Sequence, residues 1–223
     1  MPSDNHHLRA GRMRGEGKLP AMTASSPSFK IAATRLISAV VFYLTGGRGM
    51  HQRDCALANK FDRTIIIGNT ASGKSWLSKN LGAKLSLNVV DLDQIRWIEG
   101  DYSRKETKST AIEKTVREAE NDQWIIEGVY GWLVIPIIER ATCLIWIDIP
   151  WSESRKNLLA RETARGPSGN FAELETWSSN YWERSSASSY KAHFQLYNEF
   201  LGPKYRLANM KESSAFVAGL ERV

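Results

Sequence analysis

The 223-residue sequence is poor in cysteine and has no long uninterrupted hydrophobic run. Its two cysteines, Cys55 and Cys143, show neither metal-ligand spacing nor a disulfide framework, so we expect a reducing compartment and a cytoplasmic location. The apolar stretch at residues 31–44 is interrupted by Arg35 and Ser38 and is shorter than a membrane-spanning helix needs. We therefore expect no membrane association, with a targeting segment as the alternative that this stretch leaves open.

Excess charge is also missing from residue 50 onward. The formal net charge is +6, but residues 1–49 carry seven Lys or Arg against two acids, which places +5 there and leaves +1. A nearly neutral domain lacks the clustered cations that bind nucleic-acid backbones, so nucleic acid is not an expected partner. The sequence predicts a domain at 50–223 preceded by a disordered extension at 1–49, rich in Gly, Ser, Pro and Arg up to Lys30, or by an over-long reading of the start site.

From Met50 onward, short apolar runs alternate with segments of helical periodicity. The predicted strands are Thr64–Ile67, Leu87–Val90, Trp124–Ile126, Cys143–Ile149 and Tyr205–Leu207. The predicted helices are Lys74–Lys84, Arg104–Asn121, Trp151–Arg165, Phe171–Phe200 and Lys211–Leu220. Apolar strands separated by helices are typical of a parallel sheet covered on both faces. We expect an α/β three-layer sandwich built on a five-stranded parallel sheet.

Glycines and a lysine follow the first predicted strand in the stretch GNTASGKS. This stretch fits the phosphate-binding loop pattern G-x-x-x-x-G-K-[ST], and a predicted helix follows it, as the pattern requires. Backbone N–H groups of such a loop surround a phosphate at the positive end of the helix. The candidate binding residues are Gly68, Asn69, Thr70, Ala71, Ser72, Gly73, Lys74 and Ser75, while the next residue, Trp76, receives no role.

The loop predicts a P-loop NTPase fold that binds ATP with Mg²⁺. Lys74 is expected to reach the terminal phosphates, and the Ser75 hydroxyl to bind the metal ion. Asp91 and Asp93 follow the second predicted strand at the edge of the sheet where ligands bind. Alternation along a strand predicts that both carboxylates lie on the same side, where they can orient Mg²⁺ or accept a proton from an acceptor hydroxyl. A polar turn is the alternative for either residue.

The sequence resembles the small phosphate-loop kinases of the adenylate-kinase-like and shikimate-kinase-like group, and in particular the adenylate-kinase-related proteins often labelled topology modulation proteins. The resemblance covers about residues 61–220. It is carried by the segments IIIGNTASGKSWLSKNLGAKL, VVDLDQIRW, WIIEGVY, IWIDIPWSESRKNLLARETAR and YRLANMKESSAFVAGL. It implies transfer of the γ-phosphoryl group of ATP to a small acceptor, with a short lid and a mobile acceptor-binding arm.

The resemblance also implies roles for residues after the second strand. The acceptor-binding arm would be residues 96–121, where Arg96, Arg104 and Lys105 are weak candidates for contact with an anionic acceptor. Glu127 stands where the family usually has Asp, and it could serve Mg²⁺ or end its strand as a structural acid. The segment after Gly128 lacks the arginine common in nucleotide kinases, which weakens AMP as the acceptor. The aromatic residues there, Tyr130 and Trp132, are expected to pack against the sheet rather than stack on an acceptor.

The lid implied by the resemblance spans Gly166 to Gly169. Arg161 and Arg165 lie four residues apart on one helix face before it, and they are the candidates for neutralising charge on the transferring phosphoryl group. Surface solubility is the alternative for this pair. Asp148 is expected to shape the turn before Pro150, and His193 to be packed or exposed rather than catalytic. Ala208 and Asn209 fall in the segment that resembles a nucleotide-base loop.

The sequence therefore predicts an ATP-dependent phosphotransferase with Lys74, Asp93, Arg161 and Arg165 as catalytic candidates and Ser75, Asp91 and Glu127 as metal candidates. The expected partner is a small-molecule acceptor. A nucleotide-dependent DNA-topology regulator and a kinase for a non-nucleotide hydroxyl are the alternatives. The sequence gives neither the acceptor nor the oligomeric state.

Overall fold

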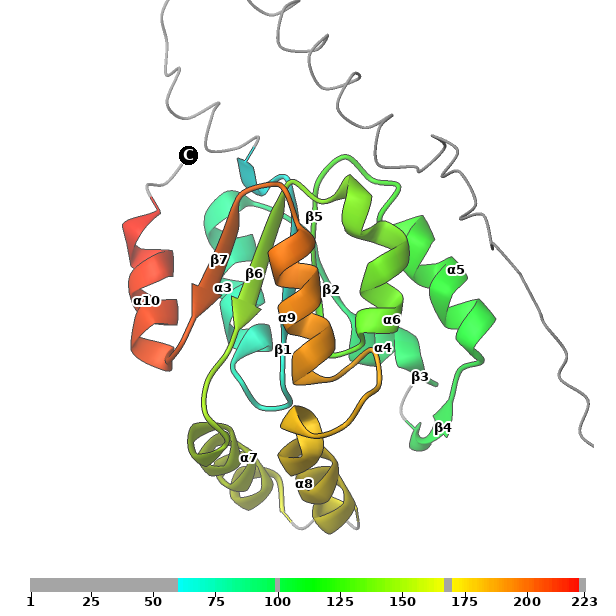
Figure 1. The fold of residues 1–223 in the computed structure, drawn as a ribbon, viewed down its shortest axis with the longest axis vertical. Coiled ribbons are helices and arrows are strands. Elements are labelled where there is room, and N and C mark those ends of the chain that lie inside the picture. Colours follow the sequence, from blue (N-terminus) through cyan, green and yellow to red (C-terminus); the bar gives the residue numbers. More distant parts are fainter. Residues whose placement is uncertain (1–59, 99–100, 167–169, 221–223) are drawn as a thin grey trace, which may run out of the picture. The chain divides into compact units, whose positions relative to one another are not determined.

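The computed structural model describes residues 60–98, 101–166 and 170–220. Its centre is a five-stranded, fully parallel sheet in the order β2-β5-β1-β6-β7 (Figure 1). The strands are β1 Arg63–Gly68, β2 Val89–Asp91, β5 Trp124–Gly128, β6 Cys143–Ile147 and β7 Lys204–Leu207. All five predicted strands are confirmed, although β2 starts two residues later and β6 ends two residues earlier than expected. The boundary predicted at residue 50 lies outside the described residues.

Helices cover both faces of this sheet, as the hydrophobic pattern predicts. One face carries α3 Lys74–Leu85 and α10 Met210–Gly219. The other carries α4 Leu92–Arg96, α5 Lys108–Glu118, α6 Gly131–Val134, the 3₁₀ helix η2 Ile135–Arg140 and α9 Tyr190–Glu199. Helices α7 Trp151–Arg165 and α8 Phe171–Ser179 lie beyond the carboxyl ends of the strands, at the bottom of Figure 1. The domain is the expected three-layer α/β sandwich.

Strand residues alternate strictly between the two hydrophobic cores. Ile65 and Ile67 of β1 face the core formed with α4, α5, α6 and α9, whereas Ile66 faces the core formed with α3 and α10. Trp146 and Cys143 of β6 divide in the same way. Burial raises the pKa of the Cys143 thiol to about 12, so this cysteine is an inert core residue. A strand buried on both faces must be apolar at every position, which explains its continuous hydrophobic run.

The segment predicted as one helix over Phe171–Phe200 is divided, which corrects that prediction. Helix α8 is followed by the 3₁₀ helix η3 Asn180–Trp182, and α9 starts only at Tyr190. Ser189 caps α9, because its hydroxyl accepts a hydrogen bond from the backbone N–H of Ala192 at 3.1 Å. Serines favour caps and turns over helix interiors, and they are concentrated in the break.

The helix predicted from Arg104 starts instead at Lys108. Residues before it form β4 Asp101–Lys105, which pairs antiparallel with β3 Trp97–Ile98. Thr107 marks the start of α5, since its hydroxyl accepts from the backbone N–H of Thr110 at 3.2 Å. Arg104 and Lys105 therefore lie on a hairpin strand and not on a helix, which corrects their expected placement.

We expect Gly131→Ala to destabilise the domain. A Cβ atom at Gly131 would lie 1.9 Å from the backbone oxygen of Ala187, so the chain must move to accept it. The expected loss is about 1–3 kcal/mol in the free energy of unfolding, measured by urea denaturation. Gly219→Ala is the matched control, because a Cβ there meets nothing within 4 Å and should leave stability nearly unchanged. Equal stability of both variants would contradict this close packing.

Candidate functional site

The register of the sheet brings three predicted site residues to one edge. Asp91 of β2 pairs with Glu127 of β5, and Ile67 of β1 pairs with Gly128 of β5. The phosphate-loop pattern starts at Gly68, directly after Ile67. Because the strands are parallel and in register, the first residue of the loop and both carboxylates lie at the carboxyl end of the sheet.

The loop from Gly68 to Ser75 adopts a conformation that few side chains allow. Gly73 has a φ of 99° and Ala71 a φ of 55°, so both lie in the left-handed region. Alternation of left-handed with right-handed backbone turns successive N–H groups toward one concave space, which suits an anion. The Ser72 hydroxyl is buried and has no hydrogen-bond partner in the described part of the chain. These features fit a phosphate group.

The start of α3 is open to an anion in the same way. Gly73 occupies the N-cap without a side-chain hydrogen bond, and the first turn carries no acidic residue. The first N–H groups of a helix need partners, and they attract negative charge. Lys74 is only 8% exposed, and its Nζ donates to the backbone oxygen of Asn69 at 2.8 Å across the loop. A buried ammonium group at a helix N-terminus also fits a phosphate.

Ser75, Glu127 and Asp91 form an oxygen-rich group beside Lys74. Burial raises the pKa of Glu127, and Asp91 and Asp93 raise it further, while Lys74 and a hydrogen bond from Ser75 partly offset the rise. The pKa of Asp91 is also raised, first by burial and then by Asp93. Carboxylate and hydroxyl oxygens are ligands that suit Mg²⁺, and a cation would relieve the repulsion between the acids.

Asp93 lies close to Asp91 for a reason other than the one predicted. It is in the first turn of α4 and not on a strand, so strand alternation does not place it. Asp91 caps this helix, because its Oδ1 accepts from the backbone N–H of Asp93 at 2.8 Å. The two carboxylates are neighbours through a helix cap.

The Asp93 carboxylate has a partner that the sequence did not predict. The Tyr130 hydroxyl donates to Asp93 Oδ1 at 2.8 Å and accepts from Trp97 Nε1 at 3.2 Å. Tyr130 also packs edge-on against Trp132 with ring centroids 6.0 Å apart. Tyr130 and Trp132 pack against the core on this face of the sheet, as expected, but the hydrogen bonds of Tyr130 were not predicted. No pattern along the sequence links Tyr130 to Asp93 or Trp97, because the two contacts span 37 and 33 residues.

Helices α7 and α8 are hydrogen-bonded to the phosphate loop. Asn157 of α7 donates to the backbone oxygen of Ala71 at 3.0 Å, and Asn69 Nδ2 donates to the backbone oxygen of Ser178 at 2.9 Å. Arg161 follows Asn157 by one turn and is exposed. Arg165 ends α7, but its side chain and residues 167–169 of the expected lid lie outside the described residues.

Arg184 is a half-buried cation that the sequence analysis missed. Its guanidinium stacks on Trp177 at 3.7 Å from the ring centroid and donates to the backbone oxygens of Trp177 and Ser188. Among the described residues it makes no ion pair with a carboxylate, and burial lowers its pKa to about 10. Its place in a stretch of serines gave no signal, because only tertiary packing buries it.

The segment resembling a nucleotide-base loop packs against the phosphate loop. A Cβ atom at Gly73 would lie 2.7 Å from the Met210 sulfur, so Met210 rests directly on the loop. Asn209 caps α10 by accepting from the backbone N–H of Glu212 at 2.9 Å. The backbone N–H of Ala208 donates to the Glu212 carboxylate at 2.7 Å. Both residues expected at the base therefore lie near the phosphate loop.

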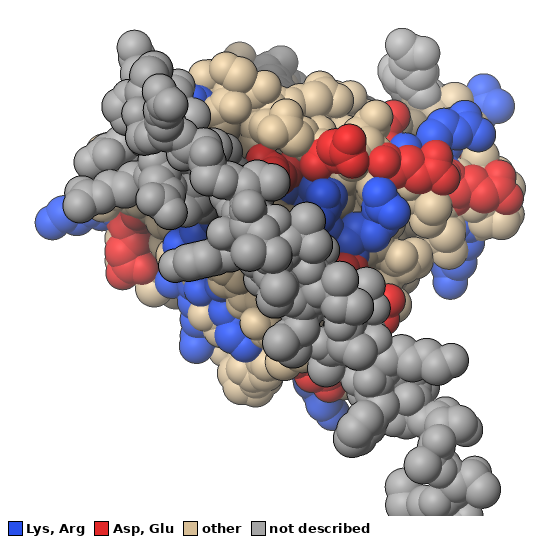
Figure 2. All heavy atoms as spheres, turned by 90° about the horizontal axis from the view of Figure 1, so that it is seen from above, with Lys and Arg blue, Asp and Glu red and all other residues tan. Residues whose placement is uncertain are grey.

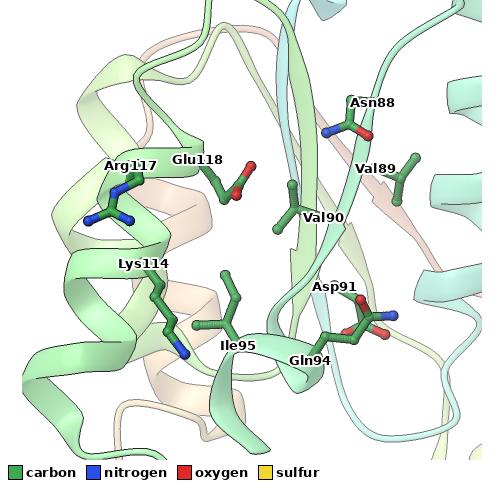
Figure 3. Close-up of a pocket in the computed structure, with 9 residues that line it drawn as sticks. All are labelled: Asn88, Val89, Val90, Asp91, Gln94, Ile95, Lys114, Arg117 and Glu118. Carbon is green, nitrogen blue, oxygen red and sulfur yellow. The ribbon is translucent and has the colours of Figure 1, made fainter. Parts of the chain in front are cut away.

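A pocket of about 330 Å³ lies next to Asp91, between β2, α4 and α5 (Figure 3). Val90 and Ile95 form an apolar side, and Lys114 and Glu118 of α5 bring charged groups. Lys114 pairs with Glu106 at 2.6 Å. The volume is in the range of small-molecule sites. Residues of the expected acceptor arm thus line a hollow beside the carboxylate edge.

Other predicted residues have structural partners. Arg96 lies over the Trp132 ring and Lys105 over the Trp97 ring, at 5.5 and 5.0 Å from the centroids. Asp148 accepts from Arg206 Nε at 2.8 Å, so it links the turn after β6 to β7.

In the described part of the chain, no helix is long and apolar enough to cross a membrane. The same residues contain no group of three or more His, Cys, Asp or Glu side chains arranged to hold a metal ion. Any ion at the carboxylate edge would therefore need oxygens from a ligand or from water, as Mg²⁺ commonly has.

No family model matches this chain, and no curated protein matches it. Among solved structures, the shikimate kinase from Aquifex aeolicus vf5 gives a TM-score of 0.42 at 17% identity, over 70% of this chain and 91% of that one. The shikimate kinase from Acinetobacter baumannii in complex with shikimate gives 0.46 at 13%, over 72% and 93%. A gluconokinase from Sinorhizobium meliloti 1021 gives 0.46 at 12%, over 71% and 93%.

His193 is a buried, neutral side chain that is hydrogen-bonded to the segment after β5. Its Nε2–H donates to the Val129 oxygen at 3.0 Å, so Nδ1 accepts from the Tyr181 hydroxyl at 2.7 Å. Burial lowers the pKa of His193 to about 3 from the ordinary 6.5. Of the two placements expected for it, packed or exposed, the structure shows the packed one, with its ring 5.5 Å from that of Tyr181.

The buried His193 predicts a pH dependence of stability. Between pH 6.5 and about 3 the unfolded chain binds a proton that the native chain does not bind, so the free energy of unfolding falls as the pH falls. The expected loss is about 2–3 kcal/mol from pH 6.5 to 4.5 beyond that of His193→Gln, whose amide can keep both hydrogen bonds. Urea denaturation at several pH values measures it. Equal pH slopes in the two proteins would contradict the assignment.

Proposed function

We propose that this chain is an ATP-dependent phosphotransferase that moves the γ-phosphoryl group of ATP to a small-molecule acceptor. The observation that carries the proposal is the loop from Gly68 to Ser75. This loop joins the buried strand β1 to the start of α3, which has no side-chain cap. The buried Lys74 side chain lies across the loop and donates a hydrogen bond to the Asn69 oxygen. The loop ends beside Asp91 and Glu127. An anion site next to a group of acids suits a nucleotide phosphate with a divalent cation.

The chain's own groups supply binding and positioning. The loop amides and Lys74 would hold the phosphates, and Ser75 with Asp91 and Glu127 would hold Mg²⁺ directly or through water. When bound, Mg²⁺ neutralises phosphate charge and orients the phosphoryl oxygens. Asp93 would orient the acceptor hydroxyl and take its proton as the acceptor oxygen bonds to the γ-phosphorus and the bond to ADP breaks. Such catalysis depends mostly on positioning and electrostatics.

Arg161 and Arg165 remain the proposed cations for the transferring phosphoryl group. The hydrogen bond from Asn157 to Ala71 supports this role for Arg161, because it docks α7 on the phosphate loop one turn before that residue. Arg184 is an additional cation near the loop. It donates to the Trp177 oxygen, and the next residue, Ser178, accepts a hydrogen bond from Asn69 of the loop.

The acceptor is best sought among hydroxyl compounds other than nucleotides. In place of an arginine after Gly128, the chain has Tyr130 bonded to Asp93, which removes one expected ligand of a nucleotide phosphate. The pocket beside Asp91 supports a small acceptor bound by the arm.

A DNA-binding regulator is less well supported. On the visible part of the face in Figure 2, Lys and Arg side chains are mixed with Asp and Glu and form no continuous basic surface. The low net charge from residue 50 onward agrees with this view.

A cytoplasmic location also remains a proposal, supported by the cysteine pattern.

The first prediction concerns the reaction itself. The full chain with Mg²⁺ and ATP should release ADP faster when one member of a panel of sugars, hydroxy acids and nucleoside monophosphates is added. Lys74→Ala should lower this rate at least a hundredfold, because it removes the cation that would stabilise the negative charge developing on the phosphate oxygens during transfer. Lys191→Ala, at an exposed position of α9, is the control and should retain full activity. Tight ATP binding without acceptor-dependent turnover would refute the phosphotransferase.

A second prediction concerns the metal ion. Ser75→Ala should raise the Mg²⁺ concentration needed for half-maximal ADP release by about tenfold or more, because one oxygen ligand is lost. Ser214→Ala, at an exposed site on α10, should leave the Mg²⁺ requirement unchanged. An unchanged requirement in Ser75→Ala would exclude this hydroxyl as a ligand.

A further inference from the structure

Three side chains from separate elements form a chain of hydrogen bonds at the carboxylate edge. Trp97 belongs to β3, Tyr130 follows β5, and Asp93 lies in α4. Trp97 Nε1 is 3.2 Å from the Tyr130 hydroxyl, which is 2.8 Å from Asp93 Oδ1. None of these contacts is local in sequence, so the tertiary fold has to build all of them.

The direction of this chain is fixed by chemistry. The indole N–H can only donate and an ionised carboxylate can only accept, so the Tyr130 hydroxyl accepts from Trp97 and donates to Asp93. A hydroxyl that already accepts a hydrogen bond is a better donor, and donation to a carboxylate is a strong, charge-assisted bond. The arrangement therefore holds one carboxylate oxygen in a defined place.

Both supporting rings are themselves restrained. Tyr130 packs edge-on against Trp132, and Gly131 next to it is in contact with the backbone of Ala187. Lys105 lies 5.0 Å above the Trp97 ring. Asp93 is exposed, and an exposed carboxylate without such support would sample several rotamers. Among the described residues, the bond from Tyr130 uses Oδ1 and leaves Oδ2 for another partner.

We propose that Tyr130, supported by Trp97, is a positioning residue that orients the Asp93 carboxylate toward the acceptor hydroxyl. This inference rests on the proposed phosphotransferase function and on the role of Asp93 in it. Because Oδ1 is held, Oδ2 meets the acceptor, and the acceptor is a compound whose reacting group is a hydroxyl. A structural tie between β5 and α4 is the competing explanation for the same contacts.

The test removes one oxygen atom. Tyr130→Phe should keep the ring packing but lower kcat about tenfold to a hundredfold, with the KM for ATP unchanged, because Asp93 is no longer oriented. Tyr205→Phe is the matched control, since Tyr205 packs between Phe61 and Phe216 on the opposite face of the sheet. Unchanged kcat in Tyr130→Phe beside an active wild type would overturn the positioning role.

A double-mutant cycle separates positioning from a structural tie. If Tyr130 acts through Asp93, adding Tyr130→Phe to Asp93→Asn should lower kcat no further, so the effects of the two substitutions on kcat will not add. Additive losses would overturn the proposal. Trp97→Phe provides a second route, because it removes only the outer donor and should give a smaller loss of kcat in the same direction.

A measurement independent of activity keeps the two proposals apart. The indole ¹H–¹⁵N resonance of Trp97, assigned with Trp97→Phe, should shift in Tyr130→Phe and stay in place in Tyr205→Phe. An unmoved resonance would overturn the hydrogen-bond chain itself. A shifted resonance in a protein that turns over no acceptor would overturn the proposed function, and with it the positioning role, but not the chain of contacts.

Discussion

The parallel pairing of β1, β2 and β5 is the constraint on which the rest of the site depends. It places Asp91 opposite Glu127 and brings the loop after Ile67 beside Gly128. A slip of one residue would exchange Ile66 and its neighbours between two cores that are lined by different helices, so the packing of both cores favours this register. The burial of the isoleucines therefore also brings Asp91, Glu127 and the loop together.

The charged groups at this edge of the sheet are largely buried, and the acids among them repel one another. Lys74 is buried, and its ammonium group is compensated by a hydrogen bond to the Asn69 oxygen and by the nearby Glu127 and Asp91 carboxylates. Burial and mutual repulsion raise the pKa of both Glu127 and Asp91. A phosphate would neutralise the ammonium group, and a divalent cation would neutralise the acids. Clustered acids with raised pKa values beside a buried lysine are more common at functional sites than in hydrophobic cores.

The sequence predicts what is local or periodic and misses what is tertiary. The left-handed backbone at Gly73 was predictable because glycine adopts a positive φ without strain, and the strands were predictable because burial on both faces requires continuous apolar runs. The side chain of Asp93 was predicted from strand alternation, but the strand ends at Asp91 and Asp93 lies in a short helix. The contact of Tyr130 with Asp93 joins residues 37 apart in sequence, and no pattern along one chain announces such a pair. The break before α9 was hidden by helical periodicity on both of its sides.

The amide of Asn69 ties the phosphate loop to the end of α8 through the Ser178 oxygen. A contact of this kind links two equilibria: the ordering of the loop around an anion and the seating of the helix beyond it. Linkage of free energies is reciprocal, so whatever steadies α8 must favour the occupied loop by the same factor that occupancy steadies α8. Helix α8 packs against η3, whose Tyr181 contacts the rings of Trp182, Tyr190 and His193. This packing would then help to set the affinity for a ligand that it does not contact.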